Sequence, residues 1–159
     1  MEIKESTIIY PLPNKSLIEE EEKFWHIKLP KDYLDFIMRY NGGEPIQDTL
    51  THNDYEYNIK RFLCILDDVE NSEYGEYDIG VVEGEIGEML TDNEDLIGIE
   101  VLPIAELYGG DMVCLDFRKN PEAPTVCIWN SEESDEFEPV TYEVAKSFTE
   151  FCNMLYEEE

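Results

Sequence analysis

The sequence predicts an α+β protein, with one domain over residues 1–159 and a mixed, mostly antiparallel sheet on which N-terminal and C-terminal helices pack. Two observations predict this class. Helical patterns lie near both ends of the chain, while runs of strand length lie between them, and such segregation is typical of α+β folds. The chain also has 159 residues, 42% of them hydrophobic, which is enough for one core and short for two.

The N-terminal region predicts an arm followed by a helix. Residues 7–12, TIIYPL, form a short apolar run that prolines interrupt, which indicates an edge strand or a docked arm. A helix is expected to start at Ser16, because Glu19 three residues later completes a capping box. Residues 19–22 form its acidic, solvated side. The expected apolar side consists of Leu17, Ile18, Phe24 and Trp25.

Residues 29–43, LPKDYLDFIMRYNGG, predict a second helix with sharp boundaries. Pro30 suits the first turn of a helix, where its missing N–H would have no partner. Gly42 and Gly43 can adopt the left-handed conformation that ends a helix, and Asn41 tolerates it. The apolar face is spaced as one helical stripe, Tyr33, Phe36, Ile37 and Tyr40.

The middle of the chain is predicted from weaker patterns. Residues 44–60 are polar, with scattered tyrosines, and indicate a surface loop with at most a short strand. Residues 61–66, RFLCIL, indicate a central strand. An acidic loop follows, and residues 79–90 then show apolar residues at helical spacing, although three glycines lower the helix propensity.

The C-terminal part predicts two strands and a helix. Residues 112–117 and 125–129 are apolar runs joined by a polar turn, which indicates an antiparallel pair. Gly109, Gly110 and Asp111 indicate a tight turn before the first strand. A closing helix is expected over residues 141–155.

Two residues of these strands are expected to have specific structural roles, because one is charged and the other is large. Asp116 alternates with apolar residues inside its strand, so it should hydrogen-bond a neighbouring turn or lie on the solvated face. Trp129 at the end of the second strand is expected to anchor the core or its rim.

The charge balance excludes some partners. There are 39 Asp and Glu against 11 Lys and Arg, so the formal net charge is −28. Such a surface repels the phosphates of nucleic acids and anionic membranes. A basic protein partner would be attracted, with a strong dependence on salt. The same charge also fits a protein that it merely keeps soluble, and both interpretations stay open.

No targeting or membrane segment is predicted. No apolar run approaches the roughly 18 residues of a membrane span, and the N-terminus lacks a basic region followed by an apolar one. The four cysteines lie in apolar surroundings without a CxxC pair, which is typical of buried free thiols in a reducing compartment. We therefore expect a cytoplasmic protein.

The sequence predicts no catalytic residue, metal site or cofactor. His26 and His52 lie far apart, and no Cys/His spacing matches a zinc site. Gly80, Gly84 and Gly87 match neither the dinucleotide motif nor the P-loop. With so many carboxylates, a catalytic acidic pair cannot be told from chance. We therefore expect a protein that is not an enzyme.

Four blocks of the chain, in order, resemble the SUKH superfamily of bacterial immunity proteins and fungal cell-wall-assembly regulators. They are the acidic helix before residue 29, the stretch LPKDYLDFIMRYNGG, the stretch LPIAELYGGDMVCLDFR, and VCIW followed by SFTEFCNML. The residues that carry the resemblance, for which we expect structural roles, are Leu29, Pro30, Tyr33, Asn41, Gly42, Gly43, Gly109, Gly110, Asp111, Asp116 and Trp129.

The resemblance implies a function. The short chain is similar to the bacterial type, whose members bind and neutralise a toxin domain, often a nuclease. We therefore expect an immunity protein that binds a cognate basic toxin through an acidic surface. The alternatives are a regulatory scaffold and, less favoured, a small-molecule-binding domain. The densest acidic loop is the predicted contact surface, Asp67, Asp68, Glu70, Glu73 and Glu76.

Overall fold

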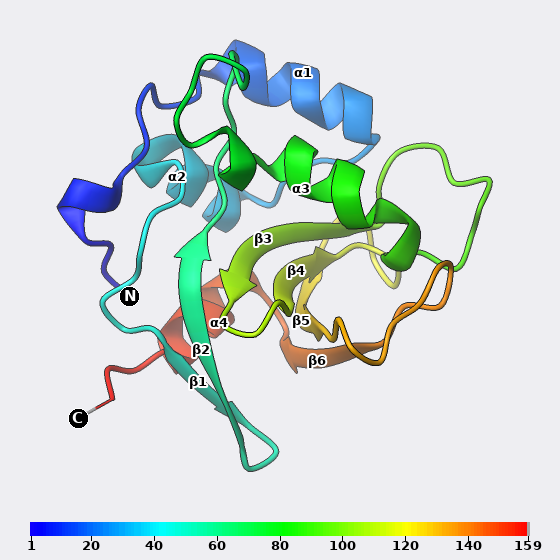
Figure 1. The fold of residues 1–159 in the computed structure, drawn as a ribbon. Coiled ribbons are helices and arrows are strands. Elements are labelled where there is room, and N and C mark those ends of the chain that lie inside the picture. The colour runs from blue at the N-terminus through cyan, green and yellow to red at the C-terminus, as the bar shows by residue number, and fades with distance from the viewer. Residues whose placement is uncertain (159) are drawn as a thin grey trace.

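The computed structural model describes residues 1–158 and confirms the α+β class (Figure 1). Within this range the strands form one six-stranded sheet in chain order, and every neighbouring pair is antiparallel. Parallel pairing in residues 1–158 is confined to an isolated bridge between Cys64 and Asp78. The strands are β1 (Thr49–His52), β2 (Tyr55–Phe62), β3 (Val101–Leu107), β4 (Met112–Asp116), β5 (Thr125–Trp129) and β6 (Thr141–Ala145).

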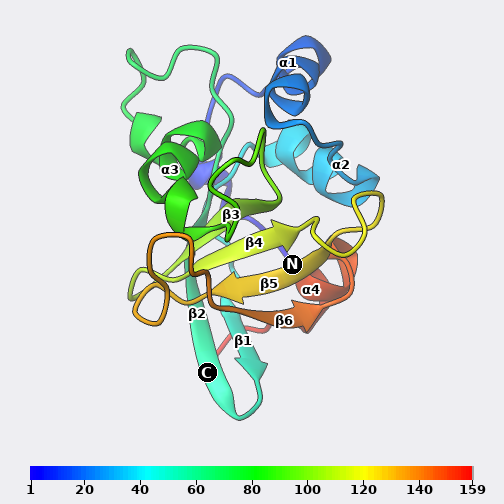
Figure 2. The same cartoon turned by 90° about the vertical axis from the view of Figure 1, so that its right-hand side faces the viewer.

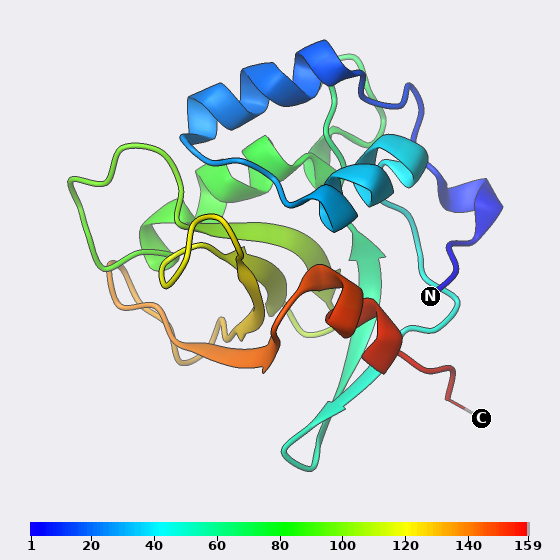
Figure 3. The same cartoon turned by 180° about the vertical axis from the view of Figure 1, so that it is seen from behind.

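Helices cover both faces of this sheet. Figure 2 places α3 (Ile79–Ile86) to one side of the sheet and α2 (Lys31–Tyr40) and α4 (Phe148–Met154) to the other. Figure 3 shows α2 and α4 from behind, with α1 (Lys15–Trp25) above them. Short 3₁₀ turns complete the elements, η1 (Glu5–Thr7), η2 (Gly75–Tyr77) and η3 (Gly87–Met89).

The core has two layers because strand side chains alternate between the faces. On β4, Val113 and Leu115 join the larger cluster, which also holds aromatic residues of α2 and α4. Cys114, between them, joins a smaller cluster with Leu90 and Trp129 under η3. The expected alternation on this strand, and its antiparallel pairing with β5, are confirmed.

The second helix has the expected sharp ends, and its C-terminal end is a junction. Asn41 adopts the left-handed conformation with φ 48° and is fully buried. Its Nδ2 donates to the carbonyls of Ile9 and Pro11, both at 3.2 Å, and its Oδ1 accepts from the Ile65 N–H at 2.8 Å. A Cβ added to Gly42 would lie 2.8 Å from the Phe62 carbonyl oxygen. The Asn-Gly-Gly end of α2 therefore joins this helix to the N-terminal arm and to the segment that follows β2.

Residues 44–60 differ from the expected loop, because most of them belong to two paired strands that run from Thr49 to Phe62. They form the hairpin β1–β2, which turns at Asn53 and Asp54, with φ of 51° and 64°. Two positive φ values are typical of the tight turn that favours hairpins. The alternation of Tyr55, Tyr57 and Ile59 with polar residues was missed because the outer part of the hairpin is exposed and its large residues there are tyrosines rather than aliphatic residues.

The strand predicted over residues 61–66 is wrong in its extent. The strand β2 begins earlier and ends at Phe62. Residues 63–66 leave the sheet and are buried between other segments, where Cys64 and Leu66 pack with Ile9 of the docked N-terminal arm. An apolar run can indicate a buried passage through the core as well as a strand.

The boundaries of three helices needed correction or extension. The first helix begins at Lys15, because Asn14 caps it by accepting from the Leu17 N–H at 2.8 Å, and Phe24 is 74% exposed rather than buried. The closing helix starts after Ser147, because residues 141–145 form β6. The helix expected over residues 79–90 is present as α3 followed by η3.

Candidate functional site

Charge is distributed unevenly along the chain, and the fold places many of the acidic residues on one side of the sheet. Between Arg61 and Arg118 there are sixteen acidic residues and no lysine, arginine or histidine. This stretch includes α3, η3 and the loop of residues 91–100, all of which lie on the same side of the sheet (Figure 1). Within this stretch of the chain no cationic side chain offsets the negative charge.

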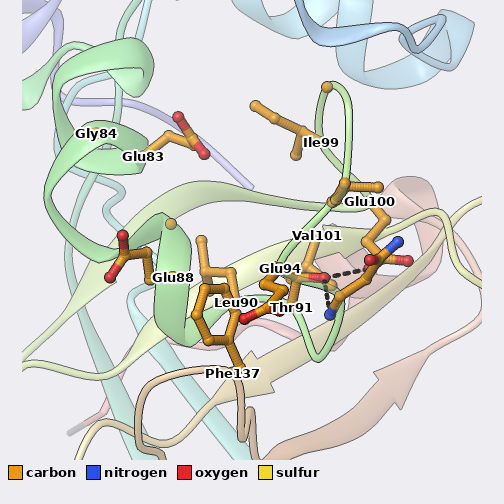
Figure 4. Close-up of a pocket in the computed structure, with 14 residues that line it drawn as sticks. Glu83, Gly84, Glu88, Leu90, Thr91, Glu94, Ile99, Glu100, Val101 and Phe137 are labelled. Atoms are coloured by element: carbon orange, nitrogen blue, oxygen red, sulfur yellow. Dashed lines mark hydrogen bonds between the residues drawn. The ribbon is translucent and has the colours of Figure 1, made fainter.

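The C-terminal end of α3, η3 and the loop of residues 91–100 border a cavity of about 270 Å³. Glu83 and Glu88 line it from α3 and η3, and Glu94 and Glu100 line it from the following loop (Figure 4). Leu90, Ile99, Val101 and Phe137 add apolar contacts to the wall. Burial raises the pKa of Glu83 above its usual value, as expected for a carboxylate with no cation beside it.

Hydrogen bonds hold the wall of this cavity in place. The Thr91 hydroxyl donates to Glu100 Oε1 at 2.5 Å and accepts from the Asn93 N–H at 3.1 Å (Figure 4). The Phe137 N–H donates to the Glu88 carbonyl at 2.6 Å. Trp129 Nε1 donates to the Met89 carbonyl at 2.8 Å. The loop of residues 131–138 and strand β5 therefore fix η3.

A second hollow of about 380 Å³ also borders η3, and Glu85, Glu88, Asp135 and Glu136 line it. Within residues 1–158, none of the carboxylates around the two hollows forms an ion pair. We name this surface the α3 acidic face. Its members are Glu83, Glu85, Glu88, Glu94, Glu100, Asp135 and Glu136.

The five acidic residues predicted from the sequence lie elsewhere. Asp67, Asp68, Glu70, Glu73 and Glu76 are all exposed on the loop that leads into α3. None of them lines the two hollows of the α3 acidic face, which are at the opposite end of the helix. Their role in binding a partner stays a prediction. The α3 acidic face was missed, although the cation-free stretch that forms most of it is visible in the sequence.

Leu29, Pro30 and Tyr33 contribute to the start of α2. Leu29 is buried, and its N–H donates to Glu22 Oε2 at 2.7 Å, which joins α1 to α2. Pro30 is the N-cap residue of α2. The Tyr33 ring is fully buried and packs edge-on against Phe148, with ring centroids 5.1 Å apart. These contacts belong to the core and lie away from the two hollows.

The remaining motif residues support the ends of the strands. Gly109 and Gly110 both have φ of 98°, and Asp111 Oδ1 accepts from the N–H and the hydroxyl of Ser131 at 2.8 and 2.9 Å. Asp116 accepts two hydrogen bonds from the Arg118 guanidinium, at 2.9 and 2.8 Å. Burial alone would raise the pKa of Asp116, but these bonds and the charge of Arg118 lower it.

The described residues offer no support for nucleophilic or metal chemistry. Cys64, Cys114 and Cys127 are buried, and burial raises the pKa of Cys64 to about 12, so its thiolate is disfavoured. Residues 1–158 contain no group of three or more His, Cys, Asp or Glu side chains arranged to hold a metal ion. None of the helices in this range combines the length and apolar character of a transmembrane span.

The geometry on this side of the sheet is that of an acidic surface with two hollows. The SMI1 / KNR4 family (SUKH-1) matches residues 12–154, nearly the whole chain, and the protein belongs to this family. Membership confirms the resemblance seen in the sequence and supports an immunity or regulatory role at the level of the family. No curated protein and no solved structure matches the chain.

Proposed function

We propose that this protein is a cytoplasmic immunity protein that binds and neutralises a basic toxin domain of nuclease type and catalyses no reaction itself. One observation carries the proposal: the α3 acidic face gathers seven carboxylates around two hollows, without an ion pair among the described residues. Family membership supports the same class of role.

The chemistry of a nuclease explains why such a face suits it. A nuclease needs a basic surface to hold phosphates, and an acidic protein can cover that surface. Unpaired carboxylates attract the basic partner over a distance set by the salt concentration and so accelerate association. Hollows with apolar walls add contact area once the partner has docked.

A capture experiment with matched variants tests the proposal. The test variant neutralises four exposed carboxylates of the α3 acidic face, Glu85→Gln, Glu88→Gln, Glu94→Gln and Glu136→Gln. The control makes the same change in net charge elsewhere, with Glu5→Gln, Glu122→Gln, Glu150→Gln and Glu157→Gln, which are also exposed. Each immobilised protein receives a lysate of the same organism and is eluted with rising salt.

The wild type and the control should retain a basic protein with a toxin domain at low salt, and the test variant should lose it. Co-expression of the wild type with that toxin should rescue growth, while the test variant should not. Retention of housekeeping proteins alone, without a toxin, would favour the regulatory role that the family also includes.

A further inference from the structure

A separate hollow of about 260 Å³ lies where strands from opposite ends of the sheet approach each other. Tyr55 and Tyr57 come from β2, whereas Tyr142 comes from β6, four strands further along the sheet. Because residues of β2 and β6 line one hollow, the sheet must curve to bring these strands together. Asp111 and Glu133 add two carboxylates, and His52, Asn53 and Asn130 complete the lining of what we name the tyrosine pocket.

The pocket holds two carboxylates that form no ion pair within residues 1–158. The Tyr142 hydroxyl lies 2.9 Å from both carboxylate oxygens of Glu133 and shares its single proton between them. Asp111 accepts from Ser131 through Oδ1 only, so its second oxygen has no hydrogen bond within residues 1–158. Neither carboxylate takes part in an ion pair in this range. Two negative groups therefore face the hollow with acceptor capacity to spare.

The tyrosines add aromatic faces next to these charges. The rings of Tyr55 and Tyr57 lie 4.6 Å apart between centroids, at an angle of 47°. Tyr55 is 62% exposed and Tyr142 is 39% exposed, although large apolar rings favour burial. Aromatic faces attract cations, and tyrosine is enriched among the residues that contribute most to protein interfaces.

The hollow also suits the size of one side chain. Pockets for drug-sized ligands occupy about 300 to 1,000 Å³, and this one is smaller, at about 260 Å³. Among cationic side chains, a guanidinium stacks flat on aromatic rings and donates two parallel hydrogen bonds to a carboxylate, whereas an ammonium is a more strongly hydrated point charge. The combination of rings and carboxylates favours arginine.

We propose that the tyrosine pocket receives an arginine side chain of the partner protein. The inference rests on the proposed function, because it assigns to the basic partner a residue that enters this pocket. Continuity supports it: the loop of residues 131–138 carries Glu133 at the tyrosine pocket and Glu136 at the α3 acidic face. A partner seated on that face can therefore reach the pocket along the same loop.

The test uses a small probe and does not need the partner. N-acetyl-arginine methylamide is titrated into the protein while NMR follows the ring signals of Tyr55, Tyr57 and Tyr142. Saturable shifts of these rings are expected. The uncharged citrulline analogue should cause no saturable shifts, and N-acetyl-lysine methylamide should bind more weakly than the arginine probe.

Variants then locate the binding. Glu133→Gln and Tyr142→Leu should each weaken binding of the arginine probe about threefold, as for one exposed charged or cation–π contact. Glu132→Gln is the matched control, since Glu132 is an exposed neighbour on the same loop that does not line the pocket, and it should bind like the wild type. Backbone amide spectra confirm that each variant is folded.

Three outcomes would overturn the inference. These are ring shifts of equal size with citrulline, equal or tighter binding of lysine, and shifts confined to the α3 acidic face. None of them would affect the capture of a toxin by that face, so failure of the pocket and failure of the proposed function are distinguishable.

Discussion

Two sides of this molecule carry many carboxylates, but these groups form ion pairs on one side and not on the other. On the surface of α1, α2 and the β4–β5 end, acidic side chains pair with cations, for example Glu19 with Lys15 and Asp116 with Arg118. On the α3 acidic face, no carboxylate forms an ion pair within residues 1–158. The net charge of −28 alone does not reveal this difference. The position of the few cations is what localises the negative potential.

The paired side also holds the structural motif, so substitutions there should affect folding most. Asn41→Ala should lower the free energy of unfolding by about 3 kcal/mol. The Ile9 and Pro11 carbonyls and the buried Ile65 N–H would each lose a hydrogen-bond partner. Asn153→Ala, an exposed position on α4, is the control and should change it by less than about 0.5 kcal/mol. Urea denaturation measures both. Equal, small effects would remove Asn41 as a structural junction.

Asp116→Asn should show how a paired carboxylate contributes to stability. The pKa of Asp116 is lowered in the folded state, so its contribution is present above the unfolded value of 3.8 and is lost as pH falls through the lowered value. The variant should therefore be less stable at pH 7 by about 1 to 2 kcal/mol. That difference should shrink in acid. A difference that is independent of pH would show that Arg118 is not the source of the effect.

Glu83→Gln on the α3 acidic face should change the free energy of unfolding at pH 7 in the opposite direction to Asp116→Asn. Burial raises the folded pKa of Glu83 above 4.5, so its stabilising contribution is present below that value and is lost as pH rises through the raised pKa. The neutral variant should then be more stable than the wild type at pH 7, by about 0.5 kcal/mol after screening by solvent. The two proteins should converge below about pH 4. Destabilisation at pH 7 would mean that the carboxylate has a partner.

The sequence was informative where local patterns determine structure. The stretch of residues 29–43 predicted α2 and its end because Pro30, the apolar spacing and Asn41-Gly42-Gly43 are local signals. The turn at Gly109 and the strands on either side of residues 118–124 were predicted for the same reason. The hairpin β1–β2 was not, because its outer part is exposed and the residues that alternate with polar ones there are tyrosines, which also occur in loops.

The candidate sites depend on contacts between distant segments, which a single sequence does not reveal. Asp135 and Glu136 join the α3 acidic face because the Phe137 N–H donates to the Glu88 carbonyl, across 49 positions of the chain. The tyrosine pocket joins Tyr57 to Tyr142 through the curvature of the whole sheet. The acidic loop of residues 67–76 was predicted as the contact surface because its charges are dense in the sequence, and a single sequence shows only such local density.

The most direct test of the account is the association rate of the captured toxin domain with the two matched four-residue variants. Stopped-flow fluorescence at low and high salt measures it. The variant of the α3 acidic face should associate about tenfold more slowly than the wild type at low salt, and the control variant only slightly more slowly. At high salt the three rates should approach one another. Equal slowing of both variants at low salt would contradict the account, because net charge rather than this face would then direct binding.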